Sequence, residues 1–382
     1  MKRMPTLILV LGLTAVLAAC SQQALTPSTT DPVRVADALT PTILLQGAGS
    51  NTAVAPLASH DNGLSSPLFG LATAPNGDIL VADADAGVVA FDGTLGVLEI
   101  PLPGVTDVSP IGRGTAWATR GAMGDPTTAV GQALFRVSNG TTRLVADLYA
   151  FEAANDPDGA GVDSNPFDVQ SLGGGAALVV DSGANALLRV SNQGAIEVLA
   201  TFPPELVSTQ NLKDLVGCPT DEGPFAFACD LPDLLPAESV PTSVAIGPDG
   251  NYYVGELKGF PGPTGASSVW RVAPHASNAV CGVDLACVKV FDGGFTSIID
   301  LAFDAAGALN VVELDEQGWA ALELFGTGSG GTVNACDLGT VTCGEVATGI
   351  PMITAITFDG DGRLWATTNA LVPPLADVIE IP

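Results

Sequence analysis

Basic residues are scarce in this sequence, which has 13 Lys and Arg against 41 Asp and Glu and a formal net charge of −28 at pH 7. A surface this acidic repels phosphate backbones, so we expect no nucleic-acid partner. Cations and cationic partners are favoured instead, although the charge also serves solubility alone.

Histidine and the common catalytic motifs are lacking as well. Only His60, beside the amino-terminal linker, and His275, in a proline-rich loop, occur, so a Ser-His-Asp triad is not supported. There is no G-x-S-x-G elbow, phosphate-binding loop or dinucleotide fingerprint. Helical periodicity is nearly absent, and residues 148–155 are the one segment expected to form a short helix.

Glycine is abundant, with 45 residues, and it marks a repeat. The stretch Val244 to Glu256, VAIGPDGNYYVGE, contains two apolar runs separated by a Pro-Asp-Gly turn. Asp-Gly between such runs predicts a hairpin, because a type I′ turn needs positive φ at both central residues. Glycine follows the first residue of this pattern by six positions in copies that start at Leu71, Val108, Val169, Val244, Leu301 and Ile356.

Each repeat carries further strand-like runs after its hairpin. A third run occurs, for example, at 133–137, and a fourth follows in most copies, for example at 142–146. Four short strands per repeat are typical of a propeller blade, so we predict an all-β, six-bladed β-propeller of four-stranded antiparallel blades over residues 42–382. The sixth repeat ends after its third strand. Because an open ring exposes strand edges, we expect an amino-terminal strand from 42–45 or 52–57 to close the last blade.

Residues 1–19 have the organisation of a lipoprotein signal peptide. Lys2 and Arg3 precede an apolar run at 7–17. The run ends in Leu-Ala-Ala-Cys, which resembles a bacterial lipobox and implies cleavage before Cys20 and its diacylation. The alternative is an uncleaved membrane anchor, for which the run is short.

Residues 20–41 are rich in Ser, Thr, Pro and Gln and are expected to form a flexible tether. We therefore predict an exported protein whose lipidated Cys20 holds it at a bacterial membrane, on the periplasmic or cell-surface side.

Six cysteines remain apart from Cys20, and each consecutive pair lies within one loop rich in Gly, Pro and Asp. Six cysteines allow 15 pairings, of which we predict the three local disulfides Cys218–Cys229, Cys281–Cys287 and Cys336–Cys343. A zinc cluster is the alternative, but the spacing is not tight and both histidines are distant in sequence.

Propeller geometry separates the loops into two groups. The glycine turns lie on one face, and the starts of the first strands, the ends of the second strands and the links between blades lie on the other. Four long insertions, at 120–131, 149–165, 202–238 and 257–267, belong to this second face, which we call the loop-rich face. Binding sites on rigid scaffolds usually lie in such loops.

The hairpin register predicts a ring of polar pairs at the channel mouth. With a two-residue turn, the residue before each repeat start lies opposite the residue twelve positions after that start. The predicted pairs are Gly70/Asp83, Asp107/Arg120, Asp168/Asp181, Ser243/Glu256, Asp300/Glu313 and Ala355/Thr368.

Two of these pairs would bring like charges together, which destabilises a sheet unless something offsets it. A calcium-type cation held by Asp168, Asp181, Asp300 and Glu313, with Asp163 and Asn165 nearby, would do so, as would a shared proton or a nearby Arg. Alternatively, the acids point into water or cap backbone amides. The stretch 155–159 looks like part of a calcium loop, but it lacks the downstream Glu of an EF-hand.

The repeat resembles NHL and SMP-30-like six-bladed propellers. Three stretches, YAFEAANDPDGAGVDSNPFDV (149–169), VPTSVAIGPDGNYYVGELKGFP (240–261) and GFTSIIDLAFDAAGALNVVE (294–313), together resemble the ScyD/ScyE family, named for proteins encoded beside scytonemin biosynthesis enzymes. The likeness extends over roughly residues 60–382 and implies an exported propeller of poorly defined activity. The Cys-bearing insertions and the lipobox depart from that family.

The sequence is compatible with two functions. The first is a non-enzymatic propeller that binds a small molecule, polysaccharide or protein on its loop-rich face. The second, implied by the SMP-30-like resemblance, is a metal-dependent lactonase, in which calcium polarises the carbonyl and an acid acts as base. We favour binding, because a fold resemblance does not by itself supply an activity.

Overall fold

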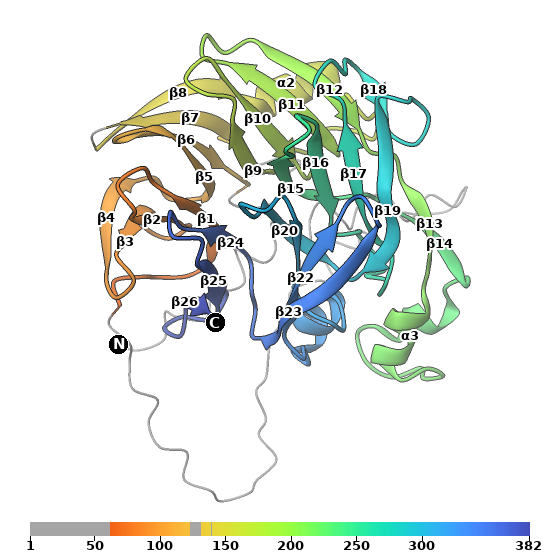
Figure 1. The fold of residues 1–382 in the computed structure, drawn as a ribbon. Helices are drawn as coiled ribbons and strands as arrows, with labels where there is room; N and C mark the ends of the chain where they lie inside the picture. The colour runs from red at the N-terminus through yellow and green to blue at the C-terminus, as the bar shows by residue number, and fades with distance from the viewer. Residues whose placement is uncertain (1–61, 123–130, 139) are drawn as a thin grey trace, which may run out of the picture.

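The six blade sheets are arranged in a ring (Figure 1). The computed structural model describes residues 62–122, 131–138 and 140–382. Within them the strands follow the predicted repeat, so the all-β six-bladed propeller is confirmed. The signal peptide, Cys20, the tether and the predicted closing strand at 42–45 or 52–57 lie outside the described residues.

The first three blades each contain four consecutive strands. They are β1 (Leu68–Thr73), β2 (Ile79–Asp83), β3 (Gly87–Phe91) and β4 (Gly96–Pro101); then β5 (Val105–Gly112), β6 (Thr115–Arg120), β7 (Ala133–Ser138) and β8 (Thr141–Asp147); then β9 (Pro166–Ser171), β10 (Ala176–Asp181), β11 (Ala186–Ser191) and β12 (Ile196–Thr201). A short strand from a later loop, β18 (Ala279–Val280), extends the third blade in parallel to β12.

The last three blades continue this order. They are β15 (Pro241–Ile246), β16 (Tyr252–Glu256), β17 (Ser267–Val272) and β19 (Cys287–Phe295); then β20 (Ile298–Phe303), β21 (Leu309–Glu313), β22 (Gly331–Asp337) and β23 (Thr342–Ile350); then β24 (Ile356–Phe358), β25 (Leu364–Thr368) and β26 (Asp377–Ile381). The sixth sheet thus shows three strands among the described residues.

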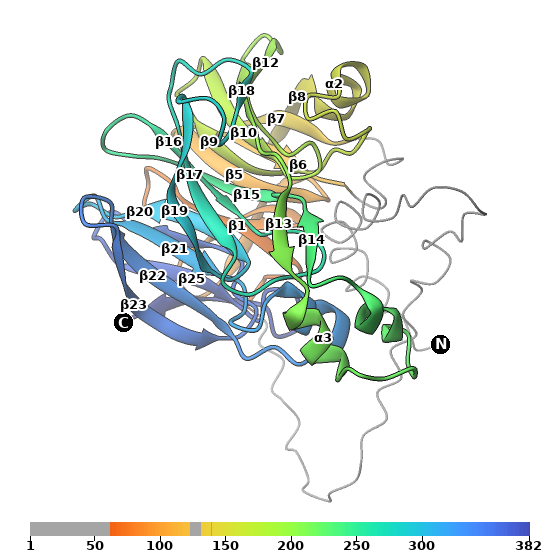
Figure 2. The same ribbon diagram turned by 90° about the vertical axis from the view of Figure 1, so that its right-hand side faces the viewer.

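The elements outside the blades gather on one side of the ring (Figure 2). They are α2 (Leu148–Asn155), the two-stranded ribbon of β13 (Glu205–Ser208) and β14 (Leu234–Ala237), α3 (Gln210–Val216), the 3₁₀ helix η2 (Ala226–Asp230) and the π-helical turn η3 (Ala321–Phe325). The predicted helix at 148–155 is α2, which begins where the Asp147 carboxylate accepts a hydrogen bond from Ala150 N. No helix of the described residues is long and apolar enough to cross a membrane.

The glycine turns differ from the predicted type I′ geometry. In the fourth blade Gly250 N donates to Gly247 O, and Gly250 has φ of 79° whereas Asp249 is not left-handed. This is a type I turn followed by one left-handed glycine, which also matches the twist of the strands. In the third blade the left-handed residue is Gly173 and not the predicted Gly175.

Six apolar clusters fill the interfaces between neighbouring blades. Trp117 of the second blade, for example, packs with Val179 and Leu188 of the third. Between the first and last blades, Leu71 and Trp365 belong to one cluster, and Leu68 N donates to Ala370 O. Burial of alternate side chains on both faces of each sheet is what holds the ring together.

Three disulfides join the predicted partners, Cys218–Cys229, Cys281–Cys287 and Cys336–Cys343. The first lies within the excursion that leads from β13 through α3 and η2 to β14, and the second closes the link between β17 and β19. The third joins opposite residues of β22 and β23. Three disulfides in one chain place the protein in an oxidising compartment outside the cytoplasm.

Candidate functional site

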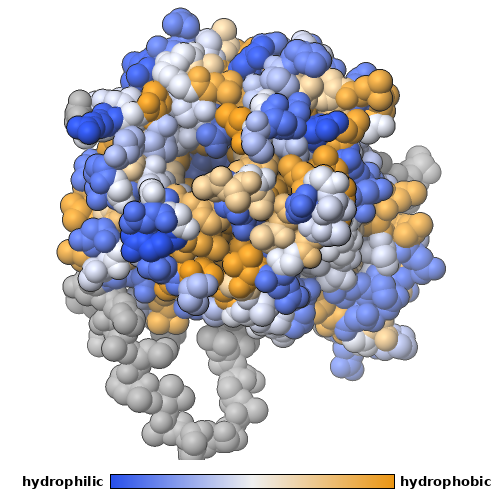
Figure 3. Space-filling model, in the orientation of Figure 1, coloured by the Kyte–Doolittle hydropathy of each residue, from blue (hydrophilic) through white to orange (hydrophobic). Residues whose placement is uncertain are grey.

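The central channel encloses about 530 Å³ and is lined by the innermost strand of each blade. At the loop-rich end Phe69, Phe167 and Ile299 are buried, and the rings of Phe69 and Phe167 meet edge to face with their centroids 5.6 Å apart. At the other end lining residues such as Phe303 and Phe358 are partly exposed. The apolar side chains therefore form a plug toward the loop-rich face, and the channel opens on the turn face, where Figure 3 shows a hollow near the middle.

Three predicted site residues, Asp107, Asp168 and Asp300, line this channel. Each occupies the position just before a repeat start, and each accepts a hydrogen bond from the backbone of the next blade. Val169 N donates to Asp107 Oδ2 (3.0 Å), Val244 N to Asp168 Oδ2 (2.5 Å) and Ile356 N to Asp300 Oδ2 (2.7 Å). The first use of these carboxylates is thus to tie innermost strands together, because strands of different blades share no sheet hydrogen bonds.

The same three carboxyl groups are electrostatically unusual. Burial raises the pKa of Asp107 well above its ordinary value, and the charge and hydrogen bond of Asp168 add to the rise. Burial also raises the pKa of Asp168, and it raises that of Asp300 well above the usual range. The two carboxyl groups of Asp107 and Asp168 therefore interact directly, although the sequence had not paired them.

The predicted pairing across the hairpins is wrong, because the glycine turns hold three residues and not two and so shift the register by one residue. In the first five blades a β-bulge near the start of the first strand shifts it by one more. Asp181 lies opposite Pro166 and not Asp168, and Glu313 lies opposite Ile298 and not Asp300. Asp83, Arg120 and Glu256 are displaced in the same way, to Leu68, Val105 and Pro241. Asp168 lies opposite Val180 and Asp300 opposite Val312. Because successive strand residues point to opposite faces, the two members of each predicted pair point away from each other. The like-charge pairs that prompted the calcium prediction at Asp168, Asp181, Asp300 and Glu313 are therefore not formed.

The acids that end the second strands instead hold the segment leading into their own blade. Asp83 Oδ2 accepts from Ser65 N (2.6 Å), Asp181 Oδ1 from Asn165 N (2.6 Å) and Glu313 Oε1 from Thr296 N (2.5 Å). Capping of backbone amides was the alternative considered from the sequence, and for these residues it is what the structure shows.

Glu256 has the most complete set of partners. Its side chain is fully buried and accepts hydrogen bonds from Ser239 Oγ, Ser268 N and Trp270 Nε1. The ammonium of Lys258, also buried, lies 3.0 Å from Glu256 Oε1 and bridges to Glu205. The arrangement is a satisfied internal ion pair, with no free coordination position for a ligand.

The other predicted residues are separated from the channel acids. Arg120 does not pair with Asp107; its Nε donates to Gly131 O and its guanidinium lies over the ring of Phe135. Asn165 accepts from Ala122 N, and Asp163 lies against Gly183. Ser243 is buried, and its hydroxyl has no hydrogen-bond partner among the described residues. The residues predicted to form one ring at the channel mouth therefore lie at several separate places.

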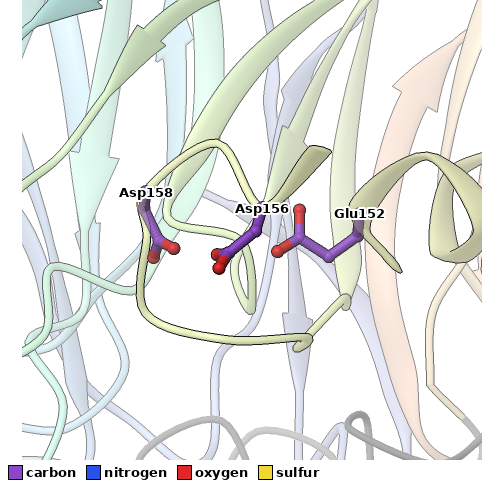
Figure 4. A group of neighbouring side chains, drawn as sticks. All are labelled: Glu152, Asp156 and Asp158. Carbon is purple, nitrogen blue, oxygen red and sulfur yellow. The ribbon is translucent and has the colours of Figure 1, made fainter. Parts of the chain in front are cut away.

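A cluster that the sequence did not assemble lies on the loop-rich face. Carboxylate oxygens of Glu152, Asp156 and Asp158 lie within 4.8 Å of one another, so the three residues could hold a metal ion (Figure 4). The sequence indicated a resemblance to part of a calcium loop at 155–159, but it did not indicate Glu152. Glu152 lies four residues before Asp156, at the end of a predicted helix. This spacing places both side chains on one helical face and could have indicated the cluster from the sequence.

Comparisons with known proteins support the fold. No family model matches the chain, and no curated protein matches its sequence. Among solved structures, a gluconolactonase from Xanthomonas campestris has a TM-score of 0.51 at 12% identity and covers 82% of this chain and 86% of its own.

Two further structures are similar to a lesser degree. A calcium-binding protein, regucalcin, from Agrobacterium tumefaciens has a TM-score of 0.49 at 15% identity over 81% of this chain and 84% of its own. A virginiamycin B lyase from Staphylococcus aureus has a TM-score of 0.45 at 14% identity, over 84% of this chain and 85% of its own. At such identities the likeness concerns the propeller fold alone.

Proposed function

We propose that this protein is an exported binding propeller of the ScyD/ScyE type, held at a bacterial membrane by acylated Cys20, and that it binds a protein partner through its loop-rich face. The observation that carries the proposal is the 202–238 excursion. It has its own ribbon, helix and disulfide, yet it leaves large apolar side chains in water: Leu206, Leu234 and Phe227 are 66%, 54% and 51% exposed.

The ribbon presents a defined apolar surface. Leu206 pairs with Pro236, and Leu234 lies two residues before Pro236 on the same strand, so the three side chains share one side of the ribbon. Val207 and Ala237 on the other side are buried. Because the chain as a whole carries a net charge of −28, we infer a partner with an apolar contact surface and a basic rim.

Binding is tested with the full chain, purified in detergent and immobilised, against envelope proteins of the producing cell. A specific partner should be retained by the wild type and lost from Leu206→Ser plus Leu234→Ser. The matched control is Val283→Ser plus Leu285→Ser, which removes two exposed apolar residues from the turn-side loop closed by Cys281–Cys287. Equal retention by all three proteins, or loss only in the control, would contradict the proposal.

The anchor is tested separately by Cys20→Ala. The wild type should fractionate with membranes and incorporate labelled fatty acid, whereas the variant should incorporate none and accumulate as unprocessed precursor. A variant that remains processed and lipid-labelled would show that Cys20 is not the acylated residue.

The second candidate is a calcium-dependent lactonase, favoured by the channel itself. Buried acids with raised pKa values in a cavity of this size are typical of functional sites, and the gluconolactonase of similar fold has a TM-score of 0.51. If this reading holds, the protein hydrolyses simple aldonolactones in the presence of calcium, and Asp107→Asn plus Asp168→Asn abolishes the rate. Under the binding proposal no lactone is hydrolysed above the buffer rate.

A further inference from the structure

We propose that Glu152, Asp156 and Asp158 form a calcium site on the loop-rich face, between the second and third blades. This site is distinct from the channel acids for which calcium was first considered, and it stands independently of the protein-binding proposal.

Local chain geometry brings the three carboxylates together. Glu152 is on the last turn of α2, and Asp156 caps that helix in the left-handed conformation, with φ of 42°. This conformation reverses the chain, and Gly159 N then donates to Asp156 O (3.1 Å). Asp158 therefore returns beside the helix, and Figure 4 shows its carboxylate turned toward those of Asp156 and Glu152.

An unsatisfied buried oxygen indicates that a ligand is needed. Glu152 is 1% exposed, and its Oε1 has no hydrogen-bond partner among the described residues. Buried carboxylate oxygens are normally paired, because leaving one without a donor costs free energy. The described ion pairs include none to this cluster, so a cation from solution is the missing partner.

The electrostatics of the surroundings point the same way. Burial is the largest cause that raises the pKa of Glu152, to about 9, and the charges of Asp181, Asp158, Asp156 and Asp163 raise it further. Each of these neighbours is acidic, so each strengthens the attraction for a cation.

The cluster is held in shape from outside, as expected of a binding site. Asn185 Nδ2 donates to Asp158 Oδ2 (3.0 Å), and Asn185 Oδ1 accepts from Val240 N (3.0 Å) in the segment leading to the fourth blade. Gly161 N donates to Asp156 Oδ1 (3.1 Å). Such outer contacts orient ligands and leave other lone pairs for the ion.

The ligand chemistry selects calcium. All three ligands are carboxylates, which suit hard cations, whereas structural zinc sites use Cys and His. Two oxygens bound to calcium at about 2.4 Å lie at most about 4.8 Å apart, and the observed oxygens fall within 4.8 Å of one another. Waters would complete the shell. The bound ion would join α2 to the loop at 156–163 and so order the 149–165 insertion.

The test is calorimetric titration of calcium into the full chain in detergent after treatment with a chelator. We expect one ion per chain with a Kd of about 0.1–1 mM, the range of extracellular calcium modules, and weaker binding of magnesium. Calcium should also slow proteolysis within 156–163. Absence of heat up to 10-fold above that range, about 10 mM calcium, would overturn the proposal.

Two sets of variants locate the site. Glu152→Gln and Asp158→Asn should each weaken calcium binding at least about 10-fold, while far-ultraviolet circular dichroism shows that the fold is retained. Asp168→Asn plus Asp300→Asn, which alters the channel, should leave the calcium affinity unchanged. Binding that survives Glu152→Gln and Asp158→Asn but is lost in the channel variant would assign the ion to the channel and refute this site.

Discussion

Acidic side chains in this propeller have different tasks according to the strand they occupy. Those before the repeat starts, such as Asp300, reach the backbone of the next blade. Those at the ends of second strands, such as Asp83, hold the segment that leads into their own blade. Glu152 has neither task, and its Oε1 has no hydrogen-bond partner in the part of the chain that the structure describes. A carboxylate that accepts hydrogen bonds from the backbone stabilises the fold, whereas a buried carboxylate oxygen without a partner marks a candidate binding site. The exposed fraction of the side chain does not separate the two groups.

Glu256 should be among the residues most important for stability. Glu256→Ala removes a fully buried acceptor, leaves Trp270 Nε1 without its partner and deprives Lys258 of one of its two carboxylates. We expect a loss of about 3 kcal/mol in the free energy of unfolding, measured by denaturant titration. Glu99→Ala, at an exposed strand position, should change it by less than about 0.5 kcal/mol. A loss for Glu256→Ala as small as that control would disprove the network's role.

Glu152 should give the stability of the calcium-free protein a distinctive pH dependence. Its pKa is about 9 in the folded state against 4.5 as the reference value, so the folded state holds a proton that the unfolded state releases. The free energy of unfolding should therefore fall as pH rises from about 4.5 to about 9, by at most about 1.4 kcal/mol per pH unit. Below this window Glu152 is protonated in both states, so its contribution to the free energy of unfolding no longer changes with pH.

The matched variant is Glu152→Gln, which has no proton to lose but still faces Asp156, Asp158, Asp163 and Asp181. Its stability should fall less steeply over the same window and exceed that of the wild type near pH 8. Parallel pH profiles for the two proteins, measured by denaturant unfolding with chelator present, would show that Glu152 is not protonated in the folded state.

At the scale of elements, the glycine turn and the recurring β-bulge together decide where the acids point. The repeat correctly predicted the hairpins and their strands, and α2 was predicted with its observed bounds. The register was wrong by one residue along each hairpin, because the turn holds three residues and not two. A bulge near the start of the first strand adds a second shift in the first five blades. Hydrophobic alternation does not reveal such an insertion, because side chains on both faces of these strands are buried in places.

The disulfides should differ in what they stabilise. Cys218–Cys229 closes a loop within the 202–238 excursion, so Cys218→Ser plus Cys229→Ser should speed proteolysis there and leave the thermal midpoint of the ring nearly unchanged. Cys281 and Cys287 are buried in the cluster between the third and fourth blades, so their double serine variant should lower the midpoint. The local effect corresponds to about 2–3 kcal/mol of chain entropy. Equal midpoint losses in both double variants would contradict this division.

At the scale of the whole molecule, closure of the ring contributes to stability through contacts that no single repeat contains. The described first and last blades share an apolar cluster and the hydrogen bond from Thr354 Oγ1 to Leu68 O. The predicted closing strand at 42–45 or 52–57 would add a fourth strand to the last blade. Deletion of residues 21–58 should therefore lower the thermal midpoint by several degrees, about 5 °C or more. A midpoint equal to that of the full chain would show that the ring is closed without this segment.

The sequence alone determined the repeat, the number of blades, the three disulfides and the position of α2, because each depends on spacing over a few residues. Only the tertiary structure decided which acids meet. Asp168 lies opposite Val180 and not Asp181, Asp107 and Asp168 converge from different blades, and Glu152 joins Asp156 and Asp158 where the chain reverses after a helix. Electrostatic sites depend on distances between groups that are far apart in the chain, and these distances are set by how the blades pack around the ring.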